Sequence, residues 1–307
     1  MRFHFAPLQG FTDSTFRQLH HDLYGGVDVY YTPFLRVERG EFRRRDIREL
    51  PTEESYTVPQ IIGADKVDEI KMMTDMLVEK GFKEINVNLG CPFPLIVRKG
   101  MGSGMLPYPD RVKAMFDAMR EYTDVKWSLK IRLGLEDAGE IDSLLPMIND
   151  FPFSEVTLHP RVGKAGYSGE IDYDAFGRFV ETCSHPVVYN GEVKTAEDIE
   201  MIQERFPNIS GIMIGRGLLE RPEFVAEYVN KTELTVSERK TKLKQLMNKM
   251  IEISVERMNG DDQALAHIRE YWNYIYPDAE KRLRKKVIKA NTVAKMKMAM
   301  AEFIAEL

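Results

Sequence analysis

Hydrogen-bonding side chains that could bind a ligand or transfer a proton stand near the ends of a series of short apolar runs. They are Gln60, Asn88, Lys130 with Arg132, His159, Asn190 and Arg216. A single residue of this kind is more often a solvated strand end than a functional group. Their repetition after successive apolar runs indicates instead that these ends form one shared site.

Two of these positions are flanked by glycine. Asn190-Gly191-Glu192 follows one apolar run, and Gly215-Arg216-Gly217 follows the next. Glycine lets backbone N–H groups approach a phosphate closely, and an arginine can add a bidentate charged contact. The two segments therefore predict a site for a phosphorylated ligand, which could be a substrate or a cofactor.

Lys130 and Cys91 could take part in the chemistry itself. A cation in the middle of the site could stabilise negative charge on a reduced flavin ring, although Lys130 could equally be paired with Glu192. Cys91 lies in the loop sequence Asn88-Leu89-Gly90-Cys91-Pro92 and is not placed like a core residue. Most lone cysteines are nevertheless inert thiols, and an inert thiol is the alternative here.

Two further segments lead to structural expectations. Residues 99–104, Lys-Gly-Met-Gly-Ser-Gly, are rich enough in glycine to move as a lid. Cys183, the other cysteine, lies among apolar residues inside a predicted helix, where we expect a structural role. With only two cysteines far apart in the sequence, neither a disulfide framework nor a cysteine-rich metal site is expected.

Short β-rich runs alternate with amphipathic helical segments, which is typical of a parallel α/β protein. The expected strands are 3–6, 27–32, 57–62, 84–88, 127–131, 155–159, 186–190 and 211–214. The expected helices include 66–80, 110–122, 173–183 and 196–205, the last with Thr195 as N-cap and Asp198 as its capping partner. Eight strands favour a closed (β/α)8 TIM barrel, in which chemistry occurs at the carboxyl ends of the strands. The alternative, a doubly wound sheet, requires a glycine fingerprint after the first strand, and Ala6-Pro7-Leu8-Gln9-Gly10 is not one.

The α/β alternation ends near residue 230, and from about residue 235 the pattern is purely helical. We expect a barrel over residues 1–230 and a small all-α helical bundle over 235–307, with about four helices and breaks at Asn259-Gly260 and Pro277. The net charge is −5, but residues 235–307 carry +5 and the remainder carries −10. Residues 281–301 contain eight basic side chains and no acidic one. An anionic macromolecule could dock on such a tail, although the charges could also belong to a solvated helix face.

In combination, these residues resemble the tRNA-dihydrouridine synthases, and the match runs in order over essentially the whole barrel. The residues that carry it are Ala6-Pro7-Leu8-Gln9-Gly10, Thr12-Asp13, Phe16-Arg17, Gln60, Asn88-x-Gly90-Cys91-Pro92, Lys99-Gly100-x-Gly102-x-Gly104, Lys130-x-Arg132-x-Gly134, His159, Asn190-Gly191 and Met213-Ile214-Gly215-Arg216-Gly217. The helical tail is also similar to the RNA-binding domain of that family. Its segments Ala266-His267-Ile268-Arg269 and Lys285-Lys286 resemble the bacterial subfamily that acts on position sixteen of the D-loop.

The resemblance implies an enzyme whose FMN, reduced by NADPH, delivers hydride to C6 of a uracil ring while Cys91 protonates C5. It implies that Pro7, Leu8, Gln9, Gln60, Lys130 and His159 hold the flavin ring and ribityl chain. It assigns the phosphate to Asn190, Gly191, Glu192, Gly215 and Arg216, and it places the uracil beside Asn88 and Arg132. Arg36 on the barrel and His267, Arg269 and Lys286 in the tail are the expected tRNA contacts. No metal ligand and no obligate protein partner are implied.

Two positions depart from the family pattern. Leu89 stands where the family often has a second cysteine, and His159-Pro160-Arg161-Val162 replaces the usual His-Gly-Arg-Thr. The alternatives to a tRNA reductase are an FMN barrel reductase of a small molecule, which has no use for a basic tail, and a tRNA-binding relative that has lost catalysis. No apolar run approaches the roughly 20 residues of a membrane span, and no leader is evident, so a cytoplasmic protein is expected.

Overall fold

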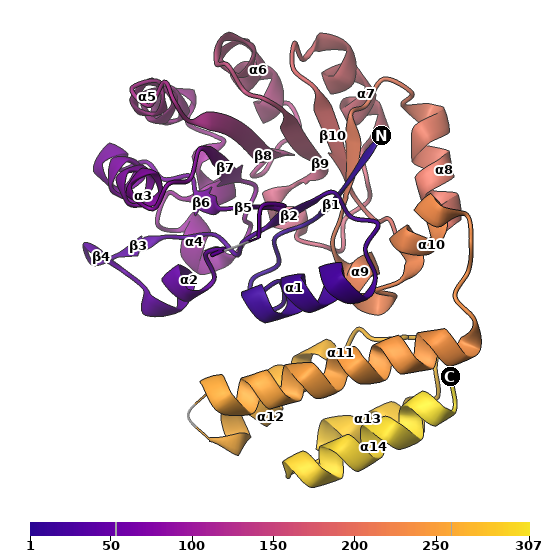
Figure 1. Cartoon of the computed structure of the whole chain (residues 1–307). Coiled ribbons are helices and arrows are strands. Elements are labelled where there is room, and N and C mark those ends of the chain that lie inside the picture. Colours follow the sequence, from indigo (N-terminus) through magenta and orange to yellow (C-terminus); the bar gives the residue numbers. More distant parts are fainter. Residues whose placement is uncertain (53, 259) are drawn as a thin grey trace.

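The computed structural model describes residues 1–52, 54–258 and 260–307, and its first part is the expected barrel of parallel strands (Figure 1). The strands are β1 (Arg2–Phe5), β2 (Val29–Tyr31), β5 (Thr57–Val58), β6 (Gln60–Ile62), β7 (Glu84–Leu89), β8 (Lys126–Gly134), β9 (Val156–Val162), β10 (Val187–Asn190) and β11 (Gly211–Ile214). They form one sheet in the order β5-β2-β1-β11-β10-β9-β8-β7-β6.

The barrel closes through a strand that the sequence predicts as continuous. The run 57–62 is divided into β5, which pairs with β2, and β6, which pairs with β7. Pro59 lies at the division, because proline has no N–H to contribute to a ladder. Gln60 consequently begins β6 and does not end a strand, so its expected position at a strand end is wrong.

Helices surround the barrel on its outer face (Figure 1). The longer ones are α1 (Ser14–Leu23), α3 (Val67–Glu79), α5 (Pro109–Met119), α6 (Glu140–Asp150), α7 (Tyr173–Thr182), α8 (Ala196–Arg205) and α10 (Phe224–Asn230). Shorter elements occupy the loops: the hairpin β3 (Val37–Glu38) and β4 (Glu41–Phe42), α2 (Arg44–Arg48), α4 (Pro94–Val97), α9 (Arg216–Glu220), and the 3-10 turns η1 (Gly102–Met105) and η2 (Gly163–Ala165). The capping box of Thr195 and Asp198 is confirmed. Cys183 lies just past α7 and not inside it.

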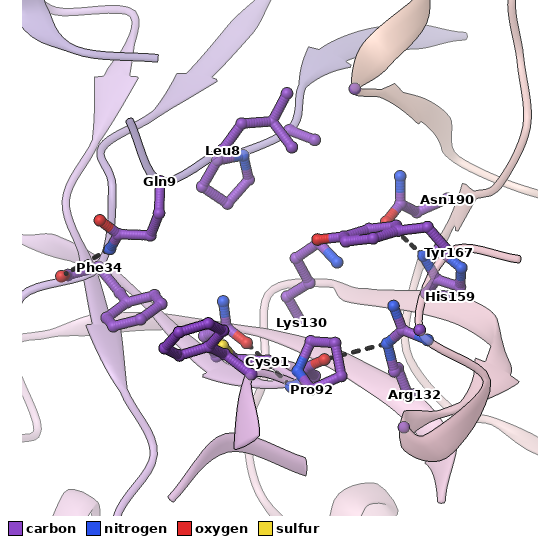
Figure 2. A pocket seen from close by; sticks show the side chains of 18 of the residues that line it. Leu8, Gln9, Phe34, Cys91, Pro92, Lys130, Arg132, His159, Tyr167 and Asn190 are labelled. Atoms are coloured by element: carbon purple, nitrogen blue, oxygen red, sulfur yellow. Dashed lines mark hydrogen bonds between the residues drawn. The ribbon is translucent and has the colours of Figure 1, made fainter. Parts of the chain in front are cut away.

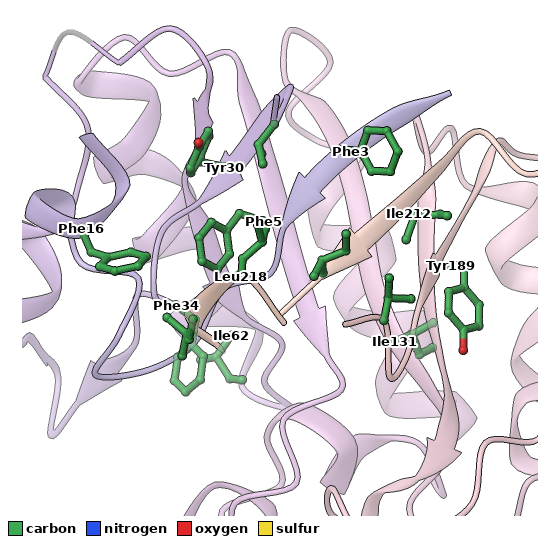
Figure 3. Close-up of a cluster of buried hydrophobic side chains, with 14 of the residues drawn as sticks. Phe3, Phe5, Phe16, Tyr30, Phe34, Ile62, Ile131, Tyr189, Ile212 and Leu218 are labelled. Atoms are coloured by element: carbon green, nitrogen blue, oxygen red, sulfur yellow. The ribbon is translucent and has the colours of Figure 1, made fainter. Parts of the chain in front are cut away.

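Aromatic and branched side chains fill the layer between strands and helices (Figure 3). Phe5 on β1 packs edge to face on Phe16 of α1, with 5.8 Å between ring centroids. Two strands along the sheet from β1, Phe176 of α7 packs on Tyr189 of β10 in the same way. This layer fixes the strands, so the residues at their carboxyl ends have defined positions.

The tail consists of α11 (Val236–Arg257), α12 (Asp261–Tyr271), α13 (Lys281–Lys289) and α14 (Val293–Ala305), as expected. The break predicted at Asn259-Gly260 falls between α11 and α12, with Asn259 outside the described residues. Trp272 is fully buried and packs edge to face on Phe303, which joins α12 to α14. In the part of the chain described, no helix has both the length and the apolar character that a membrane crossing requires.

The tail is attached to the barrel at the start of α1. Arg257 donates to the hydroxyl oxygens of Ser14 (3.1 Å) and Thr15 (2.9 Å), and the His267 ring lies 3.1 Å from the Asp13 carboxylate. Phe11 packs edge to face against Tyr271. Because the β1–α1 loop lies at the carboxyl end of the barrel, these contacts fix the tail beside the barrel mouth.

Candidate active site

A cavity of about 1000 Å³ opens at the carboxyl ends of the strands. The loops after β1, β7, β8, β9, β10 and β11 line it, and Tyr274 of the tail completes its rim. In Figure 2, Leu8 and Gln9 face Cys91 and Pro92 across the opening, and Lys130 lies between them and the group formed by Arg132, His159 and Asn190. Residues that are distant in the sequence therefore meet at one site.

The loop after β1 forms one wall. The Leu8 N–H donates to the Thr12 hydroxyl oxygen at 2.8 Å, and the Gln9 amide donates to the Phe34 carbonyl at 3.2 Å. Pro7 lies beside them on the same loop. This wall presents the apolar side chain of Leu8 and the ring of Pro7, whose backbone has no N–H that needs a partner. It therefore suits a flat aromatic ligand.

Cys91 sits on a loop that is supported from below by the glycine-rich segment. The Cys91 carbonyl accepts from the Ser103 N–H (3.1 Å) and hydroxyl (3.0 Å), and the Gly102 N–H donates to Gly63. Gly102 has a φ of +56°, and a Cβ there would lie 2.9 Å from the Cys91 carbonyl oxygen. The expectation of a mobile lid at 99–104 is therefore wrong for η1: its glycines allow close packing beneath Cys91, and η1 is buried.

The Cys91 thiol is partly buried, and burial raises its pKa above the ordinary value. The charges of Lys130 and Arg132 act in the opposite direction, but more weakly. The thiol is consequently protonated at neutral pH, and nearby cations would stabilise the thiolate left after it gives up a proton. The group has the properties of a general acid.

Lys130 lies in the middle of the cavity floor. Burial, followed by the charge of Arg132, lowers the pKa of its ammonium group to about 7. The alternative pairing with Glu192 is not observed: the Glu192 carboxylate contacts Arg161 at 2.9 Å and also binds Arg216. Lys130 thus carries a destabilised charge, which a negatively charged partner would stabilise.

Arg132 joins the two loops on either side of Lys130. Its guanidinium donates to the Gly90 carbonyl (3.0 Å) and to the Val162 carbonyl (3.0 Å), and it is almost fully buried. The strands here continue past their expected ends, since β8 runs to Gly134 and β9 to Val162. The two buried carbonyl bonds leave the outer edge of the guanidinium to face the cavity.

His159 has a free ring nitrogen next to the cavity. Nδ1 lies 3.3 Å from the Asn190 side-chain oxygen, while Nε2 is buried and has no hydrogen-bond partner among the described residues. Burial and the neighbouring cations hold the pKa of His159 well below its usual range, so the ring is neutral. Asn190 in turn donates to the Met213 carbonyl at 2.8 Å. An unsatisfied buried nitrogen of this kind suits a polar ligand atom.

The expected phosphate residues Asn190, Gly191, Glu192, Gly215 and Arg216 all line the same end of the cavity. At Gly191 a Cβ would lie 2.1 Å from the Tyr189 hydroxyl, so a side chain at this position would collide with its own strand. At Gly215 the nearest atom to a Cβ is 3.6 Å away. Gly191 is therefore required for close packing against Tyr189, whereas Gly215 has no such close contact, and Arg216 adds a positive charge.

Two residues of this end were not singled out by sequence reasoning. Arg161 is buried, donates to the Gly169 carbonyl at 2.6 Å and shares Glu192 with Arg216. Its place two residues after His159, near the carboxyl end of β9, is a signal that could have found it. Tyr167 lies under two guanidinium groups, those of Arg216 (5.0 Å) and Arg132 (5.6 Å). It belongs to an irregular loop, where periodicity gives no signal.

Four expected site residues do not line the cavity. Gln60 is buried beneath Asn88 and donates to Asn86. In the tail, His267 contacts Asp13, Arg269 donates to the Ala290 carbonyl at 2.6 Å, and Lys286 pairs with Glu302 at 2.6 Å. Arg36 and Asn88, by contrast, do line it.

Comparison with known proteins identifies the family of the chain. The sequence model of the family described as dihydrouridine synthase (Dus) matches residues 4–306. The tRNA-dihydrouridine synthase B of Pasteurella multocida is 29% identical over 223 residues, which cover 72% of this chain and 67% of that protein. The protein of the same name from Escherichia coli K12 is 29% identical over 222 residues, covering 71% and 68%.

Solved structures resemble the chain in fold. Morphinone reductase superposes with a TM-score of 0.50 at 10% identity, covering 78% of this chain and 88% of its own. Histamine dehydrogenase from Rhizobium sp. 4-9 gives 0.53 at 12% identity, covering 88% and 49%. At such low identities the likeness shows the barrel fold alone.

The pKa of Lys130 gives a testable dependence of stability on pH. Since its pKa is lowered in the folded state, the charge opposes folding fully below about pH 7, and this cost fades as pH rises toward 10.5. Lys130→Met should therefore unfold at a higher temperature than the wild type at pH 6, with a smaller difference at pH 9, when both are free of cofactor. Lys126→Met, an exposed lysine of the same strand, is the control. A pH-independent difference would contradict the assigned pKa.

Proposed function

The chain belongs to the dihydrouridine synthase family, and we propose that it reduces the C5–C6 double bond of a D-loop uridine in tRNA with electrons from NADPH. As a member of this family it is an FMN-dependent oxidoreductase that acts on uridine in tRNA. The observation that carries the proposal is the meeting of a protonated thiol, a lysine with no ion-pair partner among the described residues, and a glycine-lined anion site around one cavity. Position sixteen is the uridine that the tail sequence predicts.

The cavity has groups that fit FMN. The phosphate of FMN would lie against Gly191, Gly215 and Arg216, and the flavin ring against the wall formed by residues 7–9. Nε2 of His159, which has no partner among the described residues, would be available to a polar atom of the cofactor. Bound there, FMN supplies the hydride for the pyrimidine ring. Lys130 would stabilise the negative charge of the reduced flavin, because its own ammonium is short of a partner in the cavity.

The remaining side chains act on the uracil. Asn88 and Arg132 would hold the base beside Cys91, and the thiol would donate its proton to C5. Burial keeps the proton on sulfur until the base arrives, since it raises the pKa of Cys91. The target base must leave its stack to reach this depth, which is the usual behaviour of enzymes that modify bases.

Arg216 tests the phosphate site. Arg216→Ala should weaken FMN binding by roughly 10- to 100-fold, because a charge-assisted hydrogen bond is worth about 1.5–3 kcal/mol. Fluorescence titration of the cofactor-free protein with FMN measures the dissociation constant. Arg221→Ala, an exposed arginine five residues later, is the matched control and should bind as the wild type does. Equal affinity in the two variants would place the phosphate elsewhere.

Cys91 tests the acid. Cys91→Ala should bind FMN and accept electrons from NADPH at the wild-type rate, yet lose roughly 10²–10⁴-fold in uridine reduction. Single-turnover assays with pre-reduced protein and tRNA lacking dihydrouridine separate the two steps. Cys183→Ala, which changes the other thiol, should be fully active. A Cys91 variant with wild-type turnover would show that another group supplies the proton.

The tail is proposed to bind the tRNA while the barrel performs the chemistry. Among the described residues Lys281, Lys285 and Lys289 of α13 are exposed and have no ion-pair partner, unlike Lys286. Their charges remain available to phosphates, and Arg36 at the cavity mouth could extend the contact from the barrel side. The contacts of Arg257 hold the tail beside the mouth, so a tRNA bound to the tail would lie next to the barrel.

Replacing Lys281, Lys285 and Lys289 together with alanine should weaken tRNA binding and flatten its salt dependence. Removing one lysine–phosphate interaction lowers the slope of log affinity against log salt by about 0.7–0.9. Filter binding at several salt concentrations gives the slope, and flavin content should not change. Lys83→Ala with Lys126→Ala, at the opposite end of the barrel, is the control. An unaltered slope in the α13 variant would mean that these lysines serve only solubility.

A further inference from the structure

A chain of four side-chain hydrogen bonds runs from the Cys91 loop into the barrel interior. The Gly90 N–H donates to the Asn88 side-chain oxygen (2.9 Å), and Asn88 Nδ2 donates to Gln60 Oε1 (2.9 Å). Gln60 Nε2 donates to Asn86 Oδ1 (2.7 Å), and Asn86 Nδ2 donates to the Ser128 hydroxyl (2.8 Å). The residues come from the neighbouring strands β6, β7 and β8, on which Gln60, Asn86 and Ser128 are paired in register.

The direction of this chain is fixed by a backbone group. A backbone N–H can only donate, so the Gly90 N–H requires an oxygen from Asn88. The Asn88 nitrogen must then point to Gln60, whose oxygen accepts, and the Gln60 nitrogen must point to Asn86. Each amide has one orientation that satisfies both neighbours, and reversing any of them would place two donors or two acceptors together.

This polarity decides what Asn88 presents to the cavity. Its oxygen is used by Gly90 and one Nδ2 hydrogen by Gln60, which leaves the second Nδ2 hydrogen for a ligand. Asn88 lines the cavity three residues before Cys91. The residue can therefore donate to a carbonyl oxygen, which uracil has at both C2 and C4, whereas cytosine carries an amino group at C4.

We propose that Asn86 is a positioning residue, which together with Gln60 holds Asn88 as a hydrogen-bond donor to a carbonyl oxygen of the target uracil. The uracil part of this assignment rests on the proposed function. Gln60 then acts behind Asn88, in agreement with its position beneath the cavity. Asn86 has no exposed surface, so it touches neither cofactor nor base and acts only through Gln60.

A purely structural role for Asn86 predicts a different response to mutation. On stability alone, an apolar residue of similar size costs less at this position than a buried carboxylate does, although it leaves the Gln60 amide without its partner. If Asn86 is a positioning residue, activity follows the opposite order, and Asn86→Asp is the more active variant. Asn86→Asp still offers an oxygen to Gln60 Nε2 and preserves the polarity, whereas Asn86→Leu leaves that nitrogen without an acceptor and frees Gln60 and Asn88 to rotate.

The test compares Asn86→Leu and Asn86→Asp in the holoenzyme, using single-turnover reduction of uridine in tRNA and thermal unfolding. Asn86→Leu should be at least as stable as Asn86→Asp, yet its single-turnover rate constant for uridine reduction at subsaturating tRNA should be about tenfold or more lower, since tenfold corresponds to one hydrogen bond of about 1.4 kcal/mol. Ser128→Ala, which alters only the far end of the hydrogen-bond chain, should have a small effect on activity. Activity that follows stability, with Asp the poorer variant, would overturn the proposal.

A second measurement does not depend on tRNA. With asparagine labelled by nitrogen-15, the Asn88 side-chain hydrogen that is bonded to Gln60 should exchange slowly with solvent in the wild type and in Asn86→Asp. It should exchange at least tenfold faster in Asn86→Leu. Slow exchange in all three would overturn the positioning role even if the enzyme is active. The expected exchange pattern in a protein that does not reduce tRNA would instead uphold the hydrogen-bond chain and refute the proposed substrate.

Discussion

The buried guanidinium of Arg132 is the interaction on which the geometry of the site depends. It binds the carbonyls of Gly90 and Val162, so one side chain holds the Cys91 loop and the loop after β9 at a fixed separation. Burying a charge is costly unless it is hydrogen-bonded, and here two backbone carbonyls satisfy it. The same charge adds to the effect of burial in lowering the pKa of Lys130, and it opposes the rise that burial causes in the pKa of Cys91. Arg132 thus affects both the position of the Cys91 loop and the proton affinities of Cys91 and Lys130.

The cavity is basic although the chain as a whole is acidic. Its lining contains two carboxylates, Glu136 and Glu192, and nine arginines and lysines: Arg36, Arg43, Arg45, Arg98, Lys130, Arg132, Lys164, Lys194 and Arg216. Glu192 binds Arg161 and Arg216. Five of the cations also pair with carboxylates, namely Arg36, Arg43, Arg45, Lys164 and Lys194. An excess of fixed positive charge in a concave site attracts anions, and both a flavin phosphate and an RNA backbone are anionic. The charge balance of the cavity therefore says more about its ligands than the net charge of −5.

Much of the barrel could be predicted from the sequence. Strands that are buried on both faces appear in it as apolar runs, and polar residues mark their carboxyl ends. Asn88, Lys130, Arg132, His159 and Asn190 meet at the mouth for this reason. Other features depend on context that one sequence does not carry. Pro59 divides a strand and moves Gln60 into the interior, and Gly102 looks like a hinge but is required for close packing against Cys91.

In the tail, too, the contacts that depend on tertiary packing could not be predicted from the sequence. Its helices follow from periodicity, but the side chains that face inward are decided by packing. His267 and Arg269 therefore serve contacts within the protein, while Tyr274 reaches the cavity from a segment that has no sequence signal.

The central claim is that this barrel reduces a uridine in tRNA, and mass spectrometry of tRNA lacking dihydrouridine tests it most directly. After incubation of that tRNA with the purified protein, FMN and NADPH, one D-loop uridine should gain two mass units and the others none. Unchanged uridines, in the presence of NADPH-reduced flavin and bound tRNA, would contradict the account.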